Sequence, residues 1–279
     1  MAEPIIEVEN LSCLSGSRYL LNSINWTVNR GEQWIVFGRN GCGKTTLLSI
    51  IAGYKSYTSG KLKVLGESYS EKNILALRKR IGWISSSFFD KYYHQESVKD
   101  IVLAGLTGTL GTDFDVADKD YAKAKELIRE LGIGSKFDMP FDMLSKGERQ
   151  HVLVARAFMT SPEILILDEP GTGLDVLARE RLLKMVQDLA KEQNTTLIYV
   201  THYLEEILPS FDKCMLLRNG AVYQLGATEE LITSENLSDF FNYPVAIDKH
   251  NGEYSFAIAS GTEEEEIARL TRKAGYHVE

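Results

Sequence analysis

A glycine-rich loop between an apolar run and a helical pattern constrains the fold more than any other feature of this sequence. Residues 33–37 (QWIVF) are typical of a buried strand, and residues 44–52 have apolar residues at helical spacing. The loop between them fits G-x-x-x-x-G-K-[ST] and consists of Gly38, Arg39, Asn40, Gly41, Cys42, Gly43, Lys44 and Thr45. Glycines in such a loop let successive backbone N–H groups surround a phosphate, and the following helix adds its positive N-terminal dipole. The order strand, loop, helix therefore predicts an α/β nucleotide-binding fold.

The loop also predicts the roles of individual side chains. Lys44 is expected to reach the β- and γ-phosphates of ATP, and the Thr45 hydroxyl to ligate Mg²⁺, with Thr46 beside it in the ATP-binding set. Cys42 has two interpretations: a thiol whose pKa the helix dipole and Lys44 lower, or a small residue that fills the loop, which the sequence favours. The alternative for the whole motif is a turn that merely caps a helix.

Two carboxylates follow a second apolar run. Residues 164–167 (ILIL) predict a buried parallel strand, which delivers Asp168 and Glu169 to the edge of the sheet where ligands bind. Asp168 can hold Mg²⁺ through water, and Glu169 can act as the general base that polarises an attacking water. An Asp-Glu pair also occurs at ordinary strand ends, so it indicates a catalytic site only in combination with the phosphate loop.

The remaining pattern predicts strands alternating with helices, hence a parallel sheet covered on both faces. Residues 29–32 are interpreted as a hairpin-like turn, and residues 87–144 as a mostly helical insertion. Beyond residue 236 we expect a small extension with a hairpin at 245–258 and a charged helix at 262–274. The expected strands are 5–8, 22–28, 33–37, 61–65, 164–167, 196–200 and 213–218, and the expected helices include 98–104, 118–131, 148–160, 176–192 and 204–208.

Composition narrows the class of partner. The 279 residues include 31 Lys+Arg against 39 Asp+Glu, a net charge of −8, and this acidity argues against nucleic acid as a partner. No apolar run approaches the length of a membrane span, and acidic residues near the N-terminus are unlike a signal peptide. Three cysteines without a C-x-x-C pair indicate neither a disulfide framework nor a zinc site. These features predict a cytoplasmic protein.

Three further motifs resemble those of the ATP-binding cassette (ABC) ATPases. Residues 144–150 (LSKGERQ) resemble the LSGGQ signature, residues 173–175 (GLD) the D-loop, and His202 in the run YVTH the switch histidine. The resemblance extends from about residue 5 to 234. A narrower likeness to single-cassette ATPases related to molybdate-associated ABC proteins rests on Trp34, Gly53-Tyr54 and the serines at 85–86.

The resemblance implies a mechanism and partners. In that family two cassettes dimerise head to tail on ATP and Mg²⁺, so that the signature of one chain completes the ATP site of the other. It implies that His202 contacts the γ-phosphate and that Asp175 belongs to the D-loop. The signature residues acting in trans would be Ser145, Lys146, Gly147 and Glu148. The implied partners are a second cassette, as a homodimer, and transmembrane permease subunits at the cytoplasmic face of the cell membrane.

The sequence departs from the family pattern in places. Ser86 stands where most cassettes have a glutamine, so it is only a tentative magnesium ligand, and the signature has Lys146 and Glu148 where glycine and glutamine are usual. Tyr19 is the nearest aromatic for stacking on adenine, with core packing as an equal alternative. The aromatic residues of segment 86–94 either line a groove for a membrane partner or pack inside the helical segment.

The predicted fold is thus the P-loop NTPase fold of ABC ATPases, with a parallel core sheet, an N-terminal antiparallel β-subdomain and an inserted helical subdomain. The predicted division places residues 1–86 and 147–235 in the nucleotide-binding core, 87–146 in the helical signature subdomain and 236–279 in a C-terminal extension. The predicted function is the ATP-hydrolysing subunit of an ABC transporter. The alternative is a soluble ABC ATPase acting in translation, repair or cluster assembly; this chain has neither the second cassette nor the long coiled coil typical of many such proteins.

Overall fold

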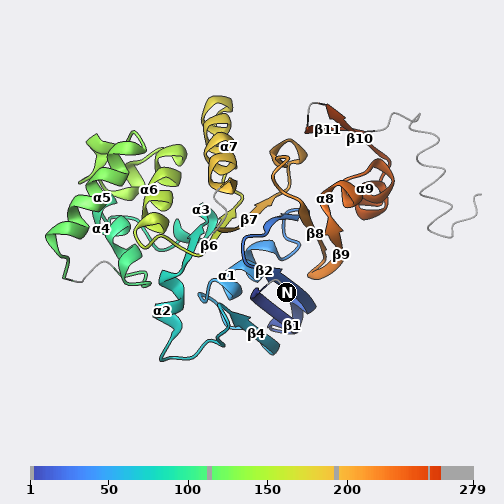
Figure 1. The fold of residues 1–279 in the computed structure, drawn as a ribbon, viewed down its shortest axis with the longest axis horizontal. Coiled ribbons are helices and arrows are strands. Elements are labelled where there is room, and N and C mark those ends of the chain that lie inside the picture. Colours follow the sequence, from blue (N-terminus) through green and yellow to red (C-terminus); the bar gives the residue numbers. More distant parts are fainter. Residues whose placement is uncertain (1–2, 112–114, 192–194, 251, 259–279) are drawn as a thin grey trace, which may run out of the picture.

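The computed structural model describes residues 3–111, 115–191, 195–250 and 252–258 (Figure 1). Within these ranges the strands form a core sheet in the order β5-β6-β7-β3-β8-β9, a second sheet in the order β2-β1-β4 and a hairpin of β10 and β11. The core strands are β3 (Gln33–Phe37), β5 (Ile81–Ile84), β6 (Ile164–Asp168), β7 (Thr196–Thr201), β8 (Lys213–Arg218) and β9 (Ala221–Ala227). The other strands are β1 (Pro4–Ser15), β2 (Arg18–Asn29), β4 (Ser59–Val64), β10 (Val245–His250) and β11 (Glu253–Ile258).

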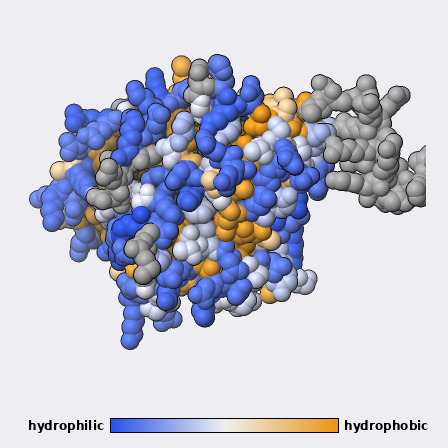
Figure 2. All heavy atoms as spheres, turned by 45° about the vertical axis from the view of Figure 1, so that its right-hand side comes forward, coloured by the Kyte–Doolittle hydropathy of each residue, from blue (hydrophilic) through white to orange (hydrophobic). Residues whose placement is uncertain are grey.

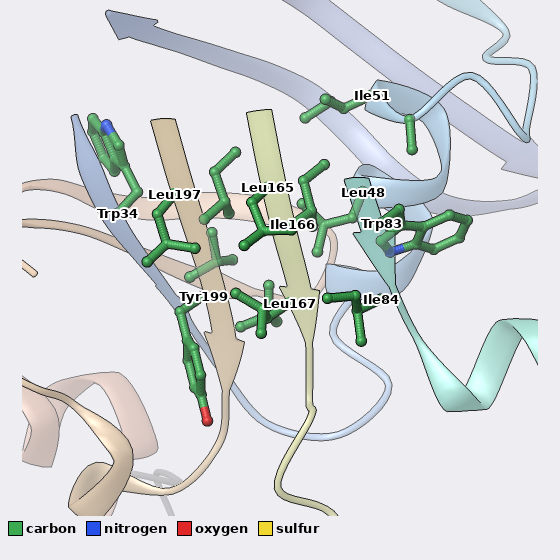
Figure 3. Close-up of a cluster of buried hydrophobic side chains, with 14 of the residues drawn as sticks. Trp34, Leu48, Ile51, Trp83, Ile84, Leu165, Ile166, Leu167, Leu197 and Tyr199 are labelled. Atoms are coloured by element: carbon green, nitrogen blue, oxygen red, sulfur yellow. The ribbon is translucent and has the colours of Figure 1, made fainter. Parts of the chain in front are cut away.

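The central strands of the core sheet are parallel, as expected. Every residue of β3, β5, β6 and β7 is buried, because helices cover both faces of a parallel sheet. Figure 3 shows the resulting cluster, in which Trp83 of β5, Leu165 of β6 and Leu197 of β7 pack with Leu48 of α1 (Lys44–Ile51). The carboxyl ends of these strands share one edge of the sheet, and this edge receives the phosphate loop and the two carboxylates.

The outer edge of the core sheet adds an antiparallel strand to the predicted parallel sheet. Strand β9, which the sequence pattern did not predict, pairs antiparallel with β8, so the sheet is mixed. Asn219 and Gly220 form the turn between them, both with positive φ, and this dipeptide is a strong hairpin signal. The half-exposed β9 alternates weakly, which explains why its pattern was missed.

The N-terminal sheet is the predicted antiparallel β-subdomain. Strand β1 pairs with both β2 and β4 in antiparallel register. The hairpin-like turn expected at residues 29–32 is wrong, since it joins β2 of this sheet to β3 of the core sheet. Gly31 donates its N–H to Thr196 Oγ1 of β7 (2.9 Å), and the chain thereby crosses from one sheet to the other.

The inserted segment is helical. The described helices there are α3 (Ser86–Phe89), α4 (Val98–Leu103), α5 (Asp118–Glu130) and α6 (Lys146–Phe158), with short 3₁₀ turns η1 (Ala104–Leu106), η2 (Gly134–Lys136) and η3 (Phe141–Met143). Helices α4, α5 and α6 pack on one another, and Figure 1 shows them as one group at the side of the core sheet. Of the other helices, α2 (Ile74–Lys79) precedes β5 and α7 (Val176–Ala190) follows β6. The helix expected at 204–208 is a single 3₁₀ turn, η4 (Leu204–Glu206).

The C-terminal part packs on the core sheet. Helices α8 (Thr228–Leu231) and α9 (Ser234–Phe241) follow β9, and the hairpin expected at 245–258 is present as β10 and β11. Phe240 of α9 is buried, with its ring 6.3 Å from that of Phe37 in β3. The predicted boundary between 235 and 236 falls inside α9, and the helix predicted at 262–274 lies outside the described residues. None of the described helices has the length and apolar character needed to cross a bilayer.

Candidate active site

The phosphate loop opens into a pocket of about 570 Å³ at the carboxyl edge of the core sheet. This volume is in the range of small-molecule binding sites. Its lining comes from the start of β2, the phosphate loop, the start of α1, the end of β6 and the β8–β9 turn, and includes Arg18, Tyr19, Gly41, Gly43, Lys44, Thr45, Thr46, Glu169, Asn219 and Gly220. The pocket therefore gathers most of the predicted ATP-binding residues.

The backbone of the loop requires glycine at two positions. Gly43 precedes α1 with a φ of +111°, which side chains rarely adopt, and a Cβ there would lie 2.9 Å from Leu20 O. A Cβ at Gly38 would collide with the carbonyl of Leu217 in β8. Arg39 and Asn40 lie exposed at the outer turn of the loop. The close approach of β2 and β8 thus holds the loop tight against the N-terminus of α1.

The structure favours the second interpretation of Cys42, as a small residue that fills the loop. Its side chain is buried in the loop, and burial raises the pKa of the thiol above its usual value. A buried thiol with a raised pKa is poorly reactive, which favours the interpretation of Cys42 as a residue that fills space in the loop.

Lys44 links the loop to the carboxylate of Glu169, the predicted general base. The buried Lys44 ammonium donates to Gly38 O (2.6 Å) and Arg39 O (3.1 Å) and lies 3.0 Å from Glu169 Oε1. The same Glu169 oxygen lies 3.4 Å from His202 Nδ1. Three residues that are far apart in the sequence, on α1 and at the ends of β6 and β7, therefore converge on one point.

Glu169 has an unusual backbone. Its φ is +50°, in the left-handed region that residues with a side chain seldom occupy. Its N–H donates to Val200 O of β7 (2.9 Å), which continues the ladder past the end of β6. Such strain is common at active sites, and here it turns the carboxylate out of the sheet toward Lys44 and His202.

Asp168 and Thr45 form an oxygen-rich site that fits Mg²⁺. The Thr45 hydroxyl donates to Asp168 Oδ1 (3.3 Å), and the Ser85 hydroxyl donates to Asp168 Oδ2 (2.9 Å). Asp168 is 3 % exposed, and burial raises its pKa to about 6. A buried carboxylate with little compensating charge is a ready partner for a hard cation, which proteins bind through one or two carboxylates and substrate phosphates.

Ser86 does not share this site. Its hydroxyl donates to Gln150 Oε1 of α6 (2.7 Å), while the neighbouring Ser85 takes the place beside Asp168. The assignment of Ser86 as a magnesium ligand stays a prediction, and the adjacent Ser85 is the serine that hydrogen-bonds the predicted ligand Asp168. Strand β5 ends at Ile84 and α3 starts at Ser86, so the turn between them directs the two side chains differently.

The signature residues cap helix α6. Ser145 is the N-cap: its hydroxyl accepts from Glu148 N (3.3 Å), and Glu148 Oε2 accepts from Ser145 N (2.9 Å), forming a capping box. The hydrogen bond from Ser145 N is the main reason that the pKa of Glu148 is lowered. Glu148 is therefore compatible with the signature position, because its carboxylate completes the cap that a glutamine could also complete. Ser145 and Lys146 are exposed, and Lys146 lies over Gly173 of the D-loop.

The remaining predicted residues also have defined places. Asp175 Oδ1 accepts from Ala178 N (2.9 Å) and so caps the start of α7, leaving the D-loop exposed beside the signature. Tyr19 is 53 % exposed at the pocket rim, which contradicts the core-packing alternative and leaves its ring open to a ligand. The aromatic residues of segment 86–94 divide: Phe89 and Tyr93 are buried, whereas Tyr92 is 47 % exposed.

Sequence reasoning missed two parts of the site. The β8–β9 turn supports the loop, because Gly220 donates its N–H to Cys42 O (2.8 Å) and accepts from Asn22 N (2.7 Å); the Asn219-Gly220 dipeptide was its available signal. Glu206 is a buried carboxyl group that accepts from Thr201 Oγ1 (2.6 Å) at the end of β7, next to His202. No spacing in the sequence distinguishes it from the exposed Glu205.

Comparison with known proteins agrees with this geometry. A family model described as ABC transporter matches residues 21–172. An uncharacterized ABC transporter ATP-binding protein of Bacillus subtilis is 39 % identical over 245 residues, covering 87 % of this chain and 93 % of its own. A molybdate import ATP-binding protein of Haemophilus influenzae is 31 % identical over 241 residues, covering 86 % and 89 %.

Solved structures share the fold. A putative metal-chelate type ABC transporter in an inward-facing conformation has a TM-score of 0.71 and 29 % identity, covering 94 % of this chain and all of its own. The cbiO1 protein of Clostridium perfringens, described as part of the transporter complex cbiONQ, has a TM-score of 0.66 and 27 % identity, covering 86 % and 95 %. These relatives are transporter components, which favours the transporter reading over a soluble ATPase of translation or repair. The chain belongs to the ABC transporter family, as an ATP-binding and ATP-hydrolysing subunit.

Proposed function

We propose that this chain hydrolyses ATP as its magnesium complex, in a head-to-tail dimer at the cytoplasmic face of the membrane, with Glu169 as the general base. The observation that carries the proposal is the convergence of Lys44 Nζ and His202 Nδ1 on Glu169 Oε1, at 3.0 and 3.4 Å. A base, a phosphate-binding cation and an imidazole at one point are what attack of water on a γ-phosphate requires.

Each group has a chemical role in this proposal. Lys44 neutralises the β- and γ-phosphate oxygens, and Glu169 accepts a proton as water attacks the γ-phosphorus and the bond to the bridging oxygen of ADP breaks. His202 hydrogen-bonds the γ-phosphate and holds the base in place. Thr45 and Asp168 would hold Mg²⁺, which supplies charge neutralisation to the phosphates when bound.

Two exposed surfaces support the dimer. Ser145 is exposed and Gly147 is partly exposed at the N-terminus of a 13-residue helix, where backbone N–H groups attract an anion. Val176 and Leu177, next to Asp175, are 67 % and 70 % exposed, and Met143, just before the signature, is 69 % exposed. These exposed apolar side chains are available for contact with a second copy of the chain. Figure 2 shows one face of the molecule, on which hydrophilic residues predominate and hydrophobic residues gather in a few patches.

We also propose that the chain divides into a nucleotide-binding core and a helical subdomain, as the sequence predicts. Residues 87–146 carry the signature toward a partner, while 1–86 and 147–235 hold the nucleotide, and the exposed Tyr92 is a contact for a membrane-spanning partner. The relatives named for molybdate import and for a transporter complex support a role in uptake driven by such a partner.

The test is phosphate release by the purified chain, alone and in membranes with its partner. Wild-type protein with Mg²⁺ should release phosphate, EDTA should stop it, and Lys44→Ala should lose at least about 100-fold in kcat/KM. The matched control is Lys125→Ala on exposed α5. Turnover by Lys44→Ala within twofold of wild type would contradict the proposed site, and co-purification with ribosomes in place of a multi-span protein would contradict the membrane role.

A further inference from the structure

A small cavity lies between the signature helix and the two active-site carboxylates. It measures about 200 Å³ and is bounded by the start of α3, helix α6, the end of β6 and the loop that follows. All of its lining residues except Leu174 have polar side chains. Because a water molecule occupies about 30 Å³, the cavity has room for several hydrogen-bonded waters.

Gln150 of α6 contributes a buried donor to this cavity. The residue is 3 % exposed, and its Oε1 accepts from Ser86 Oγ (2.7 Å). Its Nε2 atom is buried and finds no hydrogen-bond partner among the residues that the structure describes. A buried donor without a partner costs about 1 to 3 kcal/mol, so such a group normally meets a water or a ligand.

Three carboxylates line the same cavity: that of Asp90, whose Oδ2 lies 3.7 Å from Arg149, and those of Asp168 and Glu169 at the end of β6. Asp168 is held by Thr45 and Ser85, and the contacts of Glu169 with Lys44 and His202 both involve its Oε1. A water in this cavity can accept from the unused amide N–H of Gln150 and donate to Asp168 and Glu169, so the amide can fix the water and the water can fix these two carboxylates.

We propose that Gln150 is a positioning residue for ATP hydrolysis in its own chain: its Nε2 donates to a cavity water that is shared with Asp168 and Glu169, and Ser86 keeps the amide in the required orientation. The inference rests on the proposed function, since it assigns Glu169 the role of base. It has a consequence for the dimer. Gln150 lies five residues after Ser145 on one helix, about 7.5 Å along its axis, so α6 would serve its own ATP site and the partner's together.

The test separates the effect of the Gln150 amide group from the effect of the packing of its side chain. Gln150→Met keeps the length and most of the volume but removes the amide, and we expect kcat to fall about 10- to 100-fold while KM for ATP and the melting temperature stay near wild type. Ser86→Ala should lower kcat by a smaller factor, and Ser86→Thr, which retains the hydroxyl, should restore it. The matched control is Gln95→Met, an exposed glutamine bonded to Asp142, which should leave kcat unchanged.

The outcomes are distinguishable. Gln150→Met with the kcat of wild type would overturn the inference while leaving the proposed function intact. If Gln150→Met fails to fold, the serine pair decides, and equal kcat for Ser86→Ala, Ser86→Thr and wild type would overturn the inference. Full turnover by Glu169→Gln would instead contradict the proposed function on which it rests.

Discussion

Glu206 is a buried carboxyl group that supports the end of β7, next to His202. It is 1 % exposed, and its Oε2 accepts from Tyr199 OH (3.2 Å) and Thr201 Oγ1 (2.6 Å), both on β7. A Cβ at Gly171 would collide with its Oε1, so the loop after Glu169 also packs against this carboxyl. Burial raises the pKa of Glu206, although Arg179 and His202 act in the opposite direction. The group thus joins the loop after β6 to the end of β7.

This raised pKa predicts a pH-dependent stability. The folded protein binds the Glu206 proton more tightly than the unfolded chain, whose ordinary value is 4.5. Its contribution is therefore fully present below pH 4.5 and is lost as the pH rises through the higher folded value. Glu206→Gln, which resembles the protonated form, should melt at a higher temperature than wild type at pH 8, with the difference shrinking toward pH 5. A melting difference that is constant from pH 5 to 8 would contradict this assignment; Glu205→Gln is the exposed control.

Tyr19 carries a prediction about ATP affinity. The ring is half exposed at the rim of the nucleotide pocket, and stacking on a base is worth about 1 to 3 kcal/mol. Tyr19→Ala should therefore raise the Kd for ATP about fivefold or more, whereas Tyr19→Phe should leave the Kd unchanged. Isothermal titration calorimetry with a slowly hydrolysed ATP analogue would measure both values. An unchanged Kd for Tyr19→Ala would exclude stacking on adenine.

At the scale of elements, Ser145 has two roles: it stabilises helix α6, and it belongs to the proposed ATP site of the partner. Ser145 caps the helix and, in the proposed dimer, faces the partner's nucleotide. The two roles predict different variants. Ser145→Ala should lower the free energy of unfolding by about 1 kcal/mol, because the cap is lost. Ser145→Asp should keep that stability, since aspartate is a good N-cap, but should abolish ATP-dependent dimers by repelling the phosphate.

Denaturant titration and light scattering with ATP would measure both effects. Equal losses of stability for the two variants would contradict the capping role of the Ser145 side chain. Normal ATP-dependent dimers for Ser145→Asp would contradict the placement of Ser145 at the dimer interface. The control is Thr233→Ala, which removes the cap of α9 and leaves the signature untouched.

At the scale of the whole molecule, elements that are contiguous in the chain could be predicted from the sequence, whereas contacts between segments far apart in the chain could not. The strand, loop and helix at 33–52 are contiguous, so their pattern alone identified the nucleotide site. The contacts of Ser86 with Gln150 and of Ser85 with Asp168 join segments 64 and 83 residues apart, and no spacing distinguishes the two serines. The antiparallel β9 was missed for a related reason, because its half-exposed strand has no clear period.

The packing of α9 leads to a prediction about the C-terminal part. Phe240 is 2 % exposed and contacts Phe37 of the core strand that leads into the phosphate loop. Phe240→Ala should therefore lower the free energy of unfolding by about 3 to 5 kcal/mol, as for other buried aromatic residues. Phe256→Ala in the hairpin, where the ring is 42 % exposed, should cost much less in the same urea titration. Similar small losses for both would show that α9 contributes little to the core.

The most direct test of the central claim is phosphate release and oligomeric state of the Glu169→Gln protein with ATP and Mg²⁺. We expect this variant to bind ATP, accumulate as a dimer and turn over at least about 100 times more slowly than wild type, because the base next to Lys44 and His202 is lost. Glu130→Gln on exposed α5 should behave as wild type. Turnover by Glu169→Gln within a factor of two of wild type would contradict the assignment of Glu169 as the base and the site built around it.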